Sequence, residues 1–226
     1  MSKETKTTLL DAGLKTFCER GYNNSGIEAI LSVAGVPKGS FYYYFGSKED
    51  FGLQVINRFA ENYALRLHAS LSDESLSPLE RLRTHYERAI LSMESDGDRC
   101  RTGCLVGTLS QEMAAQSEVF RTRLEEIFEA WGCRLAVCLA DSQTSGEIPE
   151  DVDVRQLAEF FVISWQGAIL RAKTMRSTVP LRVFLNSMFG YVLHARVLTR
   201  DVVTATDPMP GYPPDLSSNE TVDQSR

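Results

Sequence analysis

The amino-acid sequence predicts an all-α protein in which a small N-terminal domain of three helices precedes a larger helical domain. Two observations lead to this fold class. Apolar residues recur at three- and four-residue intervals along most of the 226 residues, as in amphipathic helices, and no segment shows the two-residue alternation of a strand. We expect the N-terminal domain at residues 1–48, the second domain at 49–200, and a disordered tail at 201–226, where Pro, Ser and Asp dominate.

The first helix is expected between residues 4 and 20, because Leu10, Leu14 and Phe17 fall on one helical face. Gly21 follows at a position where helices commonly end in the left-handed conformation. The chain therefore has a defined stop before the next helix.

The second and third helices are separated by a short turn. Ser25 and Glu28 have the spacing of a capping box, which predicts a helix start, and this helix has a buried stripe of Ile27, Ile30 and Leu31. Residues 34–36 are few enough to turn sharply. Pro37 suits the first turn of the next helix, where its missing N–H is not needed.

The second domain is expected to begin with a long helix at about 48–71, opened by a second capping box at Ser47 and Asp50. The clearest later turn is at 146–149. Further helices are predicted at about 79–95, 103–115, 118–141, 154–175 and 181–199. The last two of these are the candidates for a dimer interface, in a four-helix arrangement with a second subunit.

Charge is divided unevenly along the chain. The formal net charge is −6, but residues 1–48 carry a net charge of +2 and the remainder a net charge of −8. An acidic protein with a mildly basic N-terminal part can attract phosphate there and repel it elsewhere. The absence of a long apolar run and of an apolar leader predicts a cytoplasmic protein with no membrane partner.

Five cysteines at irregular spacing argue against a disulfide framework, and no CxxC pair supports a zinc site. We therefore expect reduced thiols, no metal and no cofactor.

The third predicted helix has the features of a DNA-recognition helix. Lys38, Gly39 and Ser40 occupy its first turn, where a recognition helix meets DNA. Three successive tyrosines follow at 42–44, and because consecutive helical residues are about 100° apart, at least one phenol must be exposed. Lys48, at the start of the next helix, is placed against the helix dipole, which favours a phosphate nearby.

The segment AGVPKGSFYYYFGSKE at residues 34–49 closely resembles the signature of the TetR/AcrR family of transcriptional repressors. The resemblance implies a homodimer of all-α subunits that binds a palindromic double-stranded DNA operator and holds an inducer pocket in the second domain. Carried over position by position, it implies DNA contacts at Ser25, Gly26, Lys38, Gly39, Ser40, Tyr42, Tyr43 and Lys48.

Cys104 is the candidate for sensing an effector. It stands where a helix begins, and both the helix dipole and the nearby Arg99 and Arg101 predict a lowered thiol pKa. The segments around Cys104 and Lys173 resemble an electrophile-sensing subgroup of the same family. The resemblance implies that Cys104 is oxidised or alkylated, with Lys173 as its partner. The other four cysteines are expected to fill core or surface positions, with Cys100 as an alternative resolving thiol. The alternative is that Cys104 is a small buried apolar residue.

Two further hypotheses remain open. A small-molecule effector could bind non-covalently in an apolar pocket lined by Met113, Phe128, Trp131, Phe161, Trp165 and Met175. An enzyme could use Cys104 as nucleophile with a histidine base, but His68, His85 and His194 are scattered and lie in no catalytic motif. We therefore expect no enzymatic activity.

Overall fold

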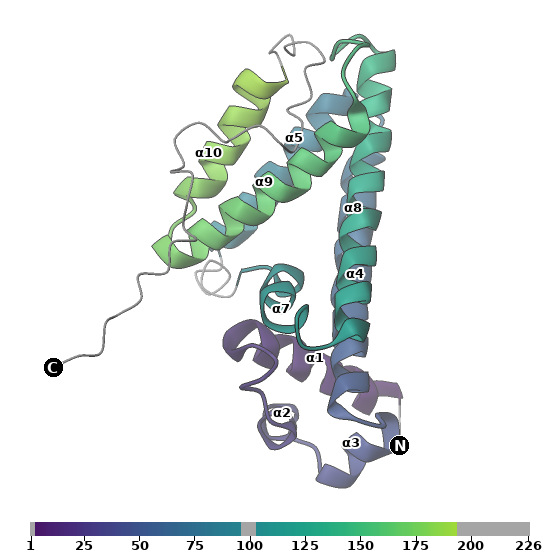
Figure 1. The fold of residues 1–226 in the computed structure, drawn as a ribbon, viewed down its shortest axis with the longest axis vertical. Helices are drawn as coiled ribbons and strands as arrows, with labels where there is room; N and C mark the ends of the chain where they lie inside the picture. Colours follow the sequence, from purple (N-terminus) through teal and green to yellow (C-terminus); the bar gives the residue numbers. More distant parts are fainter. Residues whose placement is uncertain (1–2, 96–102, 194–226) are drawn as a thin grey trace, which may run out of the picture. The chain divides into compact units, whose positions relative to one another are not determined.

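The computed structural model describes residues 3–95 and 103–193, and all of these belong to one compact unit. The described residues form helices and connecting turns without a strand, so the all-α prediction is confirmed. The elements in order are α1 Lys3–Arg20, α2 Ile27–Ala34, α3 Lys38–Tyr44, α4 Lys48–Leu71, α5 Pro78–Ser95, α7 Leu105–Met113, α8 Glu118–Thr144, α9 Val154–Met175, α10 Val179–Ser187 and the π-helical turn η1 Met188–Val192 (Figure 1).

Most predicted helices agree with these bounds, and those at 48–71 and 154–175 match residue for residue. The predicted helix at 181–199 differs, because α10 ends at Ser187 and a π-helical turn follows it. The predicted tail, together with Arg99, Cys100, Arg101 and His194, lies outside the described residues. The division at residue 48 stays a prediction.

Helices α1, α2 and α3 form the head, a name used below for residues 3–47, and α1 and α3 contact the start of α4. The head is held by an aromatic cluster in which Phe51 of α4 is fully buried. Its ring centroid lies 5.9 Å from that of Phe17, 5.1 Å from Phe41 and 4.8 Å from Phe45. Such edge and tilted contacts add to the stabilisation from apolar burial. The first turn of α4 is therefore part of the head's core.

The two predicted capping boxes have different outcomes. The hydroxyl of Ser47 accepts a hydrogen bond from the Asp50 N–H at 3.0 Å, so the predicted start of α4 is confirmed. At the start of α2 the prediction is wrong, because Gly26 occupies the N-cap position and makes no side-chain cap. The hydroxyl of Ser25 instead donates to the carbonyl oxygen of Gly21.

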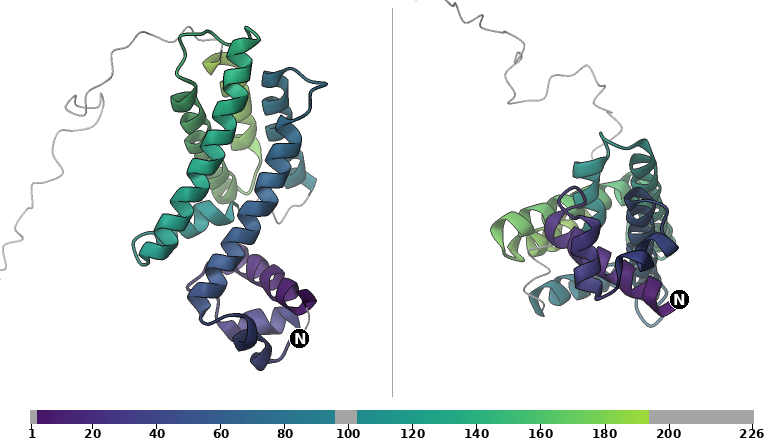
Figure 2. Two further views of the ribbon diagram at one scale, coloured as in Figure 1. Left: turned by 90° about the vertical axis from the view of Figure 1, so that its right-hand side faces the viewer. Right: turned by 90° about the horizontal axis from the view of Figure 1, so that it is seen from below.

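The body, the name used below for residues 48–193, is built from long helices that lie side by side (Figures 1 and 2). Its core centres on Tyr86 of α5, which is almost fully buried. The ring of Tyr86 stacks on Phe161 at 5.8 Å and meets Trp165 and Phe184 edge-on at 4.9 Å and 5.0 Å. These contacts join α5, α9 and α10.

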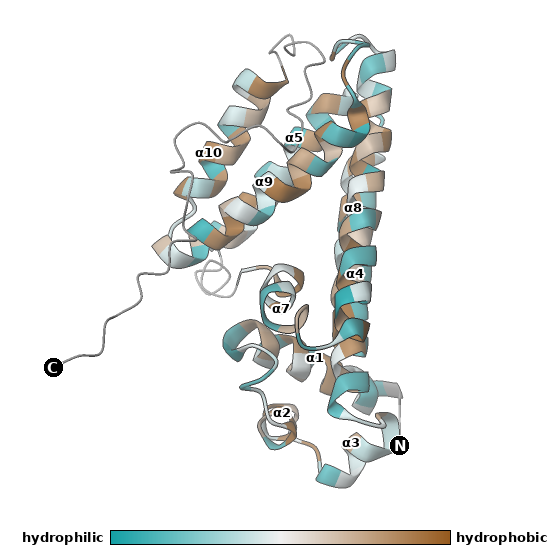
Figure 3. Cartoon of the chain, in the orientation of Figure 1, coloured by the Kyte–Doolittle hydropathy of each residue, from teal (hydrophilic) through white to brown (hydrophobic). Residues whose placement is uncertain are grey.

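Hydrophobic and hydrophilic residues both occur along the body helices (Figure 3). Ser117 and Asp153 cap α8 and α9 by accepting hydrogen bonds from backbone N–H groups of the first turn. No helix within the described ranges is long and apolar enough to cross a bilayer.

Candidate nucleic-acid interface and effector pocket

Helix α3 presents an exposed face that is anchored by aromatic residues on its opposite side. Phe41 and Phe45 are buried in the head, while the side chains of Tyr42 and Tyr43 are 55% and 67% exposed. The expectation that at least one phenol is exposed is confirmed. Exposed phenol hydroxyls can donate hydrogen bonds to phosphate oxygens.

The first turn of α3 is open to solvent at Lys38 and Gly39. A Cβ added to Gly39 would meet nothing within 4 Å, so the glycine leaves room for a close approach of DNA to the backbone. The ammonium of Lys38 lies 3.4 Å from the Glu28 carboxylate, and both side chains are well exposed. Such an exposed pair contributes little to stability and is readily exchanged for a phosphate.

Two of the residues expected at the DNA surface lie beneath it. Ser25 is fully buried and Ser40 is 3% exposed, so neither hydroxyl reaches solvent. Ser25 connects the end of α1 to the start of α2 through its hydrogen bond to Gly21. Gly26, the next residue, is exposed at the N-cap of α2.

Lys48 is half-buried and turned toward the α1–α2 turn rather than outward. Its ammonium donates to the carbonyl oxygen of Tyr22 at 2.8 Å and lies 4.3 Å from the centre of the Tyr22 ring. Burial lowers the pKa of Lys48, while the nearby Glu112 carboxylate raises it. The structure therefore gives this lysine a structural partner that the sequence did not predict.

The same turn is also held by Glu112 in α7. Its two carboxylate oxygens accept hydrogen bonds from the backbone N–H groups of Tyr22 at 2.8 Å and Asn23 at 2.6 Å. Gly21 has a φ of +78°, and a Cβ there would lie 2.6 Å from the Glu112 carboxylate. A glycine is thus required both by the backbone conformation and by the close approach of Glu112.

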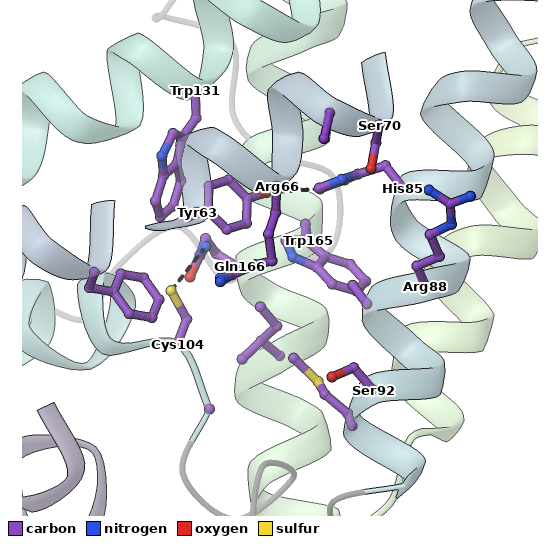
Figure 4. A pocket seen from close by; sticks show the side chains of 16 residues that line it. Tyr63, Arg66, Ser70, His85, Arg88, Ser92, Cys104, Trp131, Trp165 and Gln166 are labelled. Carbon is purple, nitrogen blue, oxygen red and sulfur yellow. Dashed lines mark hydrogen bonds between the residues drawn. The ribbon is translucent and has the colours of Figure 1, made fainter. Parts of the chain in front are cut away.

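The body contains a cavity of about 390 Å³ whose walls come from α4, α5, α8, α9 and the start of α7 (Figure 4). This volume falls in the range of small-molecule sites. The lining residues are mostly apolar or aromatic, with a few polar groups: Phe59, Tyr63, Arg66, Ala69, Ser70, His85, Arg88, Ala89, Ser92, Met93, Gly103, Cys104, Trp131, Trp165, Gln166 and Ile169.

Of the six residues predicted to line a ligand pocket, Trp131 and Trp165 line this cavity. The other four do not. Met113 and Phe161 are buried in the core, and Phe128 packs edge-on against Trp131 with ring centroids 5.5 Å apart. Met175 is exposed and borders a separate hollow on α9 and α10. Aromatic spacing alone did not separate core from cavity.

The polar lining residues were missed by sequence reasoning. On α4, Tyr63, Arg66 and Ser70 follow one another at three- and four-residue intervals, and His85, Arg88 and Ser92 do so on α5. A line of polar residues at helical spacing, on a helix that also packs against other helices, could have indicated a polar cavity wall.

His85 is buried, and its Nε2 lies 3.4 Å from the Tyr63 hydroxyl. Burial, together with the charges of Arg66 and Arg88, lowers its pKa to about 4. The histidine is therefore neutral near pH 7.

Cys104 lines the cavity at the N-cap of α7, and its sulfur accepts a hydrogen bond from Gln166 Nε2 at 3.7 Å. Burial raises the pKa of this thiol, and hydrogen bonds from Gln166 and from backbone N–H groups offset only part of that rise. The predicted lowering of the pKa is therefore wrong, since desolvation outweighs the helix terminus. Cys104 is hydrogen-bonded to Gln166, and His85 is hydrogen-bonded to Tyr63. These bonds therefore do not pair the thiol with a histidine base.

Lys173 lies near the Cys104 segment, but the thiol takes its side-chain hydrogen bond from Gln166 instead. A Cβ added to Gly103 would lie 3.4 Å from Cδ of Lys173, so the lysine stem passes beside the residue before Cys104. The described residues contain no cluster of three metal-ligating side chains.

Helices α9 and α10 share an exposed apolar face. Phe160, Ile163 and Leu170 on α9, and Val179 and Val183 on α10, are each between 46% and 59% exposed. Ala172 of α9, Phe184 of α10 and Met188 of η1 are buried within the chain and do not belong to this exposed face.

Comparison with known proteins agrees with this geometry. Residues 9–55 match the family described as bacterial regulatory proteins, tetR family, and residues 78–188 match the tetracyclin repressor-like C-terminal domain. The chain is 44% identical to the transcriptional regulator AcuR of Cereibacter sphaeroides over 81% of this chain and 82% of that protein. It is 30% identical to the transcriptional repressor NemR of Escherichia coli K12 over 79% of this chain and 88% of that protein.

Among solved structures, the regulatory protein TetR from Rhodobacter sphaeroides has a TM-score of 0.77 and 43% identity, covering 81% of this chain and 96% of that chain. The fold, the exposed α3 and these matches define a helix-turn-helix transcriptional regulator. The chain belongs to the TetR family and is a transcriptional repressor. Regulators of this family bind DNA operators and are typically dimeric, and the matched proteins are not enzymes.

Proposed function

We propose that this repressor binds its operator through Gly26, Lys38, Gly39, Tyr42 and Tyr43, and that a small molecule in the cavity releases it. Each of these five residues is exposed on α3 or at the N-cap of α2. Three other residues support this surface from beneath. Ser25 and Ser40 are buried under it. Ser25 and Lys48 also donate hydrogen bonds to the backbone carbonyl oxygens of Gly21 and Tyr22.

The observation that carries the proposal is the position of α7 between the cavity and the head. Its N-cap, Cys104, lines the cavity, and its last turn carries Glu112, which holds the N–H groups of Tyr22 and Asn23. Hydrogen bonds to a charged acceptor are worth about 1.5–3 kcal/mol each. A ligand that moves the start of α7 therefore also acts on the turn between α1 and α2. Such a ligand shifts the equilibrium only by its difference in affinity for the two states.

The test uses an operator selected in vitro and a screen for compounds that release the repressor from it. Each releasing compound is expected to change the fluorescence of Trp131 and Trp165 over the same concentration range. Glu112→Gln is expected to keep this fluorescence response. The compound should weaken operator binding of this variant several-fold less than it weakens operator binding of the wild type. Glu118→Gln, an exposed carboxylate paired with Arg121, is the control. Release without any change in tryptophan fluorescence would place the effector elsewhere.

A second candidate is covalent sensing at Cys104, which is supported by its place in the cavity wall and by the resemblance of its segment to electrophile sensors. The thiolate would add to the β-carbon of an activated alkene, and a proton from water would complete the α-carbon. The raised pKa of this thiol opposes the reaction, so we rank it below non-covalent binding.

Two measurements with N-ethylmaleimide separate the two candidates. Mass spectrometry of the treated repressor identifies the modified cysteine. Operator release by the maleimide is then compared between Cys104→Ser and Cys133→Ser. Cys133 is an exposed thiol on α8. Covalent sensing requires that only Cys104→Ser loses release by the maleimide. Equal release of both variants would exclude it.

We also propose that two copies associate through the exposed apolar face of α9 and α10. Val183→Glu would place a charge in that interface and is expected to give a monomer in analytical ultracentrifugation. Val137→Glu on α8, where the valine is 64% exposed, is the matched control and should leave the dimer intact. A dimeric Val183→Glu protein would show that another surface is used.

A further inference from the structure

The surface proposed to contact DNA includes an acidic side chain. Glu28 lies in the first turn of α2, and its carboxylate lies 3.4 Å from the ammonium of Lys38 in the first turn of α3. The side chain of Glu28 is 85% exposed, and that of Lys38 is 62% exposed. When Lys38 contacts the operator, the carboxylate beside it therefore lies at the DNA as well.

Most of the DNA surface is unfavourable for a carboxylate. The phosphates repel it, and the Lys38 ammonium that pairs with it in the free protein is attracted to those same phosphates. In the major groove, the base-edge groups that can donate to a carboxylate are the amino groups of cytosine, at N4, and of adenine, at N6. A carboxylate that gives up Lys38 to the DNA is therefore accommodated against such an amino group.

Cytosine suits a carboxylate better than adenine does. Adenine presents the N7 acceptor beside its N6 amino group, so the second carboxylate oxygen would face a lone pair. Cytosine presents its N4 amino group without an acceptor on the same edge of the base. A glutamine has the opposite preference, because its amide can accept from N6 and donate to N7 of one adenine.

We propose that Glu28 determines sequence specificity, with its carboxylate accepting a hydrogen bond from N4 of a cytosine in the operator. This proposal rests on the DNA surface proposed above and adds a base-reading residue to it. On other sequences the repulsion between the carboxylate and the phosphates is not offset, so the same residue weakens binding there. The dipole of α2 also favours an acid in its first turn, but the dipole has no influence on which base is bound. Base preference therefore separates the two explanations for this acid.

In vitro selection from random duplex DNA tests the proposal with the wild type, Glu28→Gln and Glu19→Gln. Glu19→Gln is the control, because Glu19 is an exposed acid of α1 in the same head and its substitution changes the net charge equally. The wild type and the control are expected to enrich the same operator, with a cytosine at one position of each half-site where Glu28→Gln enriches adenine. Changing that cytosine to adenine should weaken binding of the wild type about tenfold and should not weaken binding of Glu28→Gln.

Glu28→Ala gives an independent measurement, because alanine removes the carboxylate without supplying an amide. This variant should lose the preference for cytosine and gain none for adenine.

Two results would overturn the proposal. If Glu28→Gln binds every sequence more tightly and still enriches the cytosine, the carboxylate only repels phosphate. If both the operator and the affinity are unchanged, the carboxylate lies away from the DNA. Lys38→Ala separates this failure from a failure of the proposed function. If Lys38→Ala also binds the operator as tightly as the wild type does, the proposed DNA surface itself is wrong.

Discussion

Aromatic residues serve opposite purposes in the head and in the cavity wall. In the head, Phe41, Phe45 and Phe51 fill the interior and fix the orientation of α3. In the body, Trp131 and Trp165 stand around a space of about 390 Å³. The head is therefore packed to hold one conformation, whereas the cavity is left open for a ligand. Helix α7 lies between them, with Cys104 at one end and Glu112 at the other.

The largest expected effect tests this contrast within one helix. Phe51 and Phe59 both belong to α4, but Phe51 is fully buried among other rings and Phe59 borders the cavity. Phe51→Ala is expected to lower the free energy of unfolding by about 3–5 kcal/mol, since it creates a new void. Phe59→Ala should cost clearly less, because it only enlarges an existing space. Urea denaturation with equal m-values measures both. Equal losses would mean that the cavity wall is packed as tightly as the head.

The second prediction concerns pH and the buried His85. In the folded protein the pKa of His85 is about 4, while in the unfolded chain the histidine takes up a proton below about pH 6.5. The free energy of unfolding should therefore fall as the pH is lowered from about 6.5 to about 4, by up to about 3 kcal/mol from this residue.

The contribution is isolated by comparing the wild type with His85→Gln, whose unfolding should depend less on pH in that window. His68→Gln is the control, because His68 is exposed on α4. A wild type and His85→Gln with parallel pH dependence would show that the histidine titrates alike in both states.

The head could be predicted from the sequence because its signals are local. The Gly21 stop, the Ser47 cap and the alternation of buried phenylalanines with exposed tyrosines all act within a few residues. The cavity wall could not be predicted in the same way. Its arginines and tryptophans come from different helices, so their meeting depends on how those helices pack. Sequence spacing identified Trp131 and Trp165 but gave no reason to separate them from Phe161, which lies in the core.

Cys104 and Lys48 show why local rules fail where burial intervenes. Each stands at the start of a helix, where the helix dipole alone predicts its chemistry. For Cys104, desolvation raises the thiol pKa against the dipole. For Lys48, the Tyr22 carbonyl provides a nearby acceptor, contributed by a segment 26 residues earlier in the chain. The burial of Cys104 and the Tyr22 partner of Lys48 both depend on distant parts of the chain, so a short stretch of sequence cannot predict them.

The smallest expected effect separates a lysine that binds phosphate from one that positions the head. Lys38 is exposed at the start of α3, whereas Lys48 donates to Tyr22. Lys38→Ala should flatten the plot of the logarithm of operator affinity against the logarithm of salt concentration, by about 0.9 for each phosphate that the variant no longer neutralises. Lys48→Met should weaken operator binding by a similar factor at every salt concentration and leave the slope unchanged, since it removes a hydrogen bond inside the protein. Fluorescence anisotropy at four or more salt concentrations measures both slopes. If Lys48→Met flattens the plot as much as Lys38→Ala does, its ammonium leaves Tyr22 and binds phosphate in the operator complex.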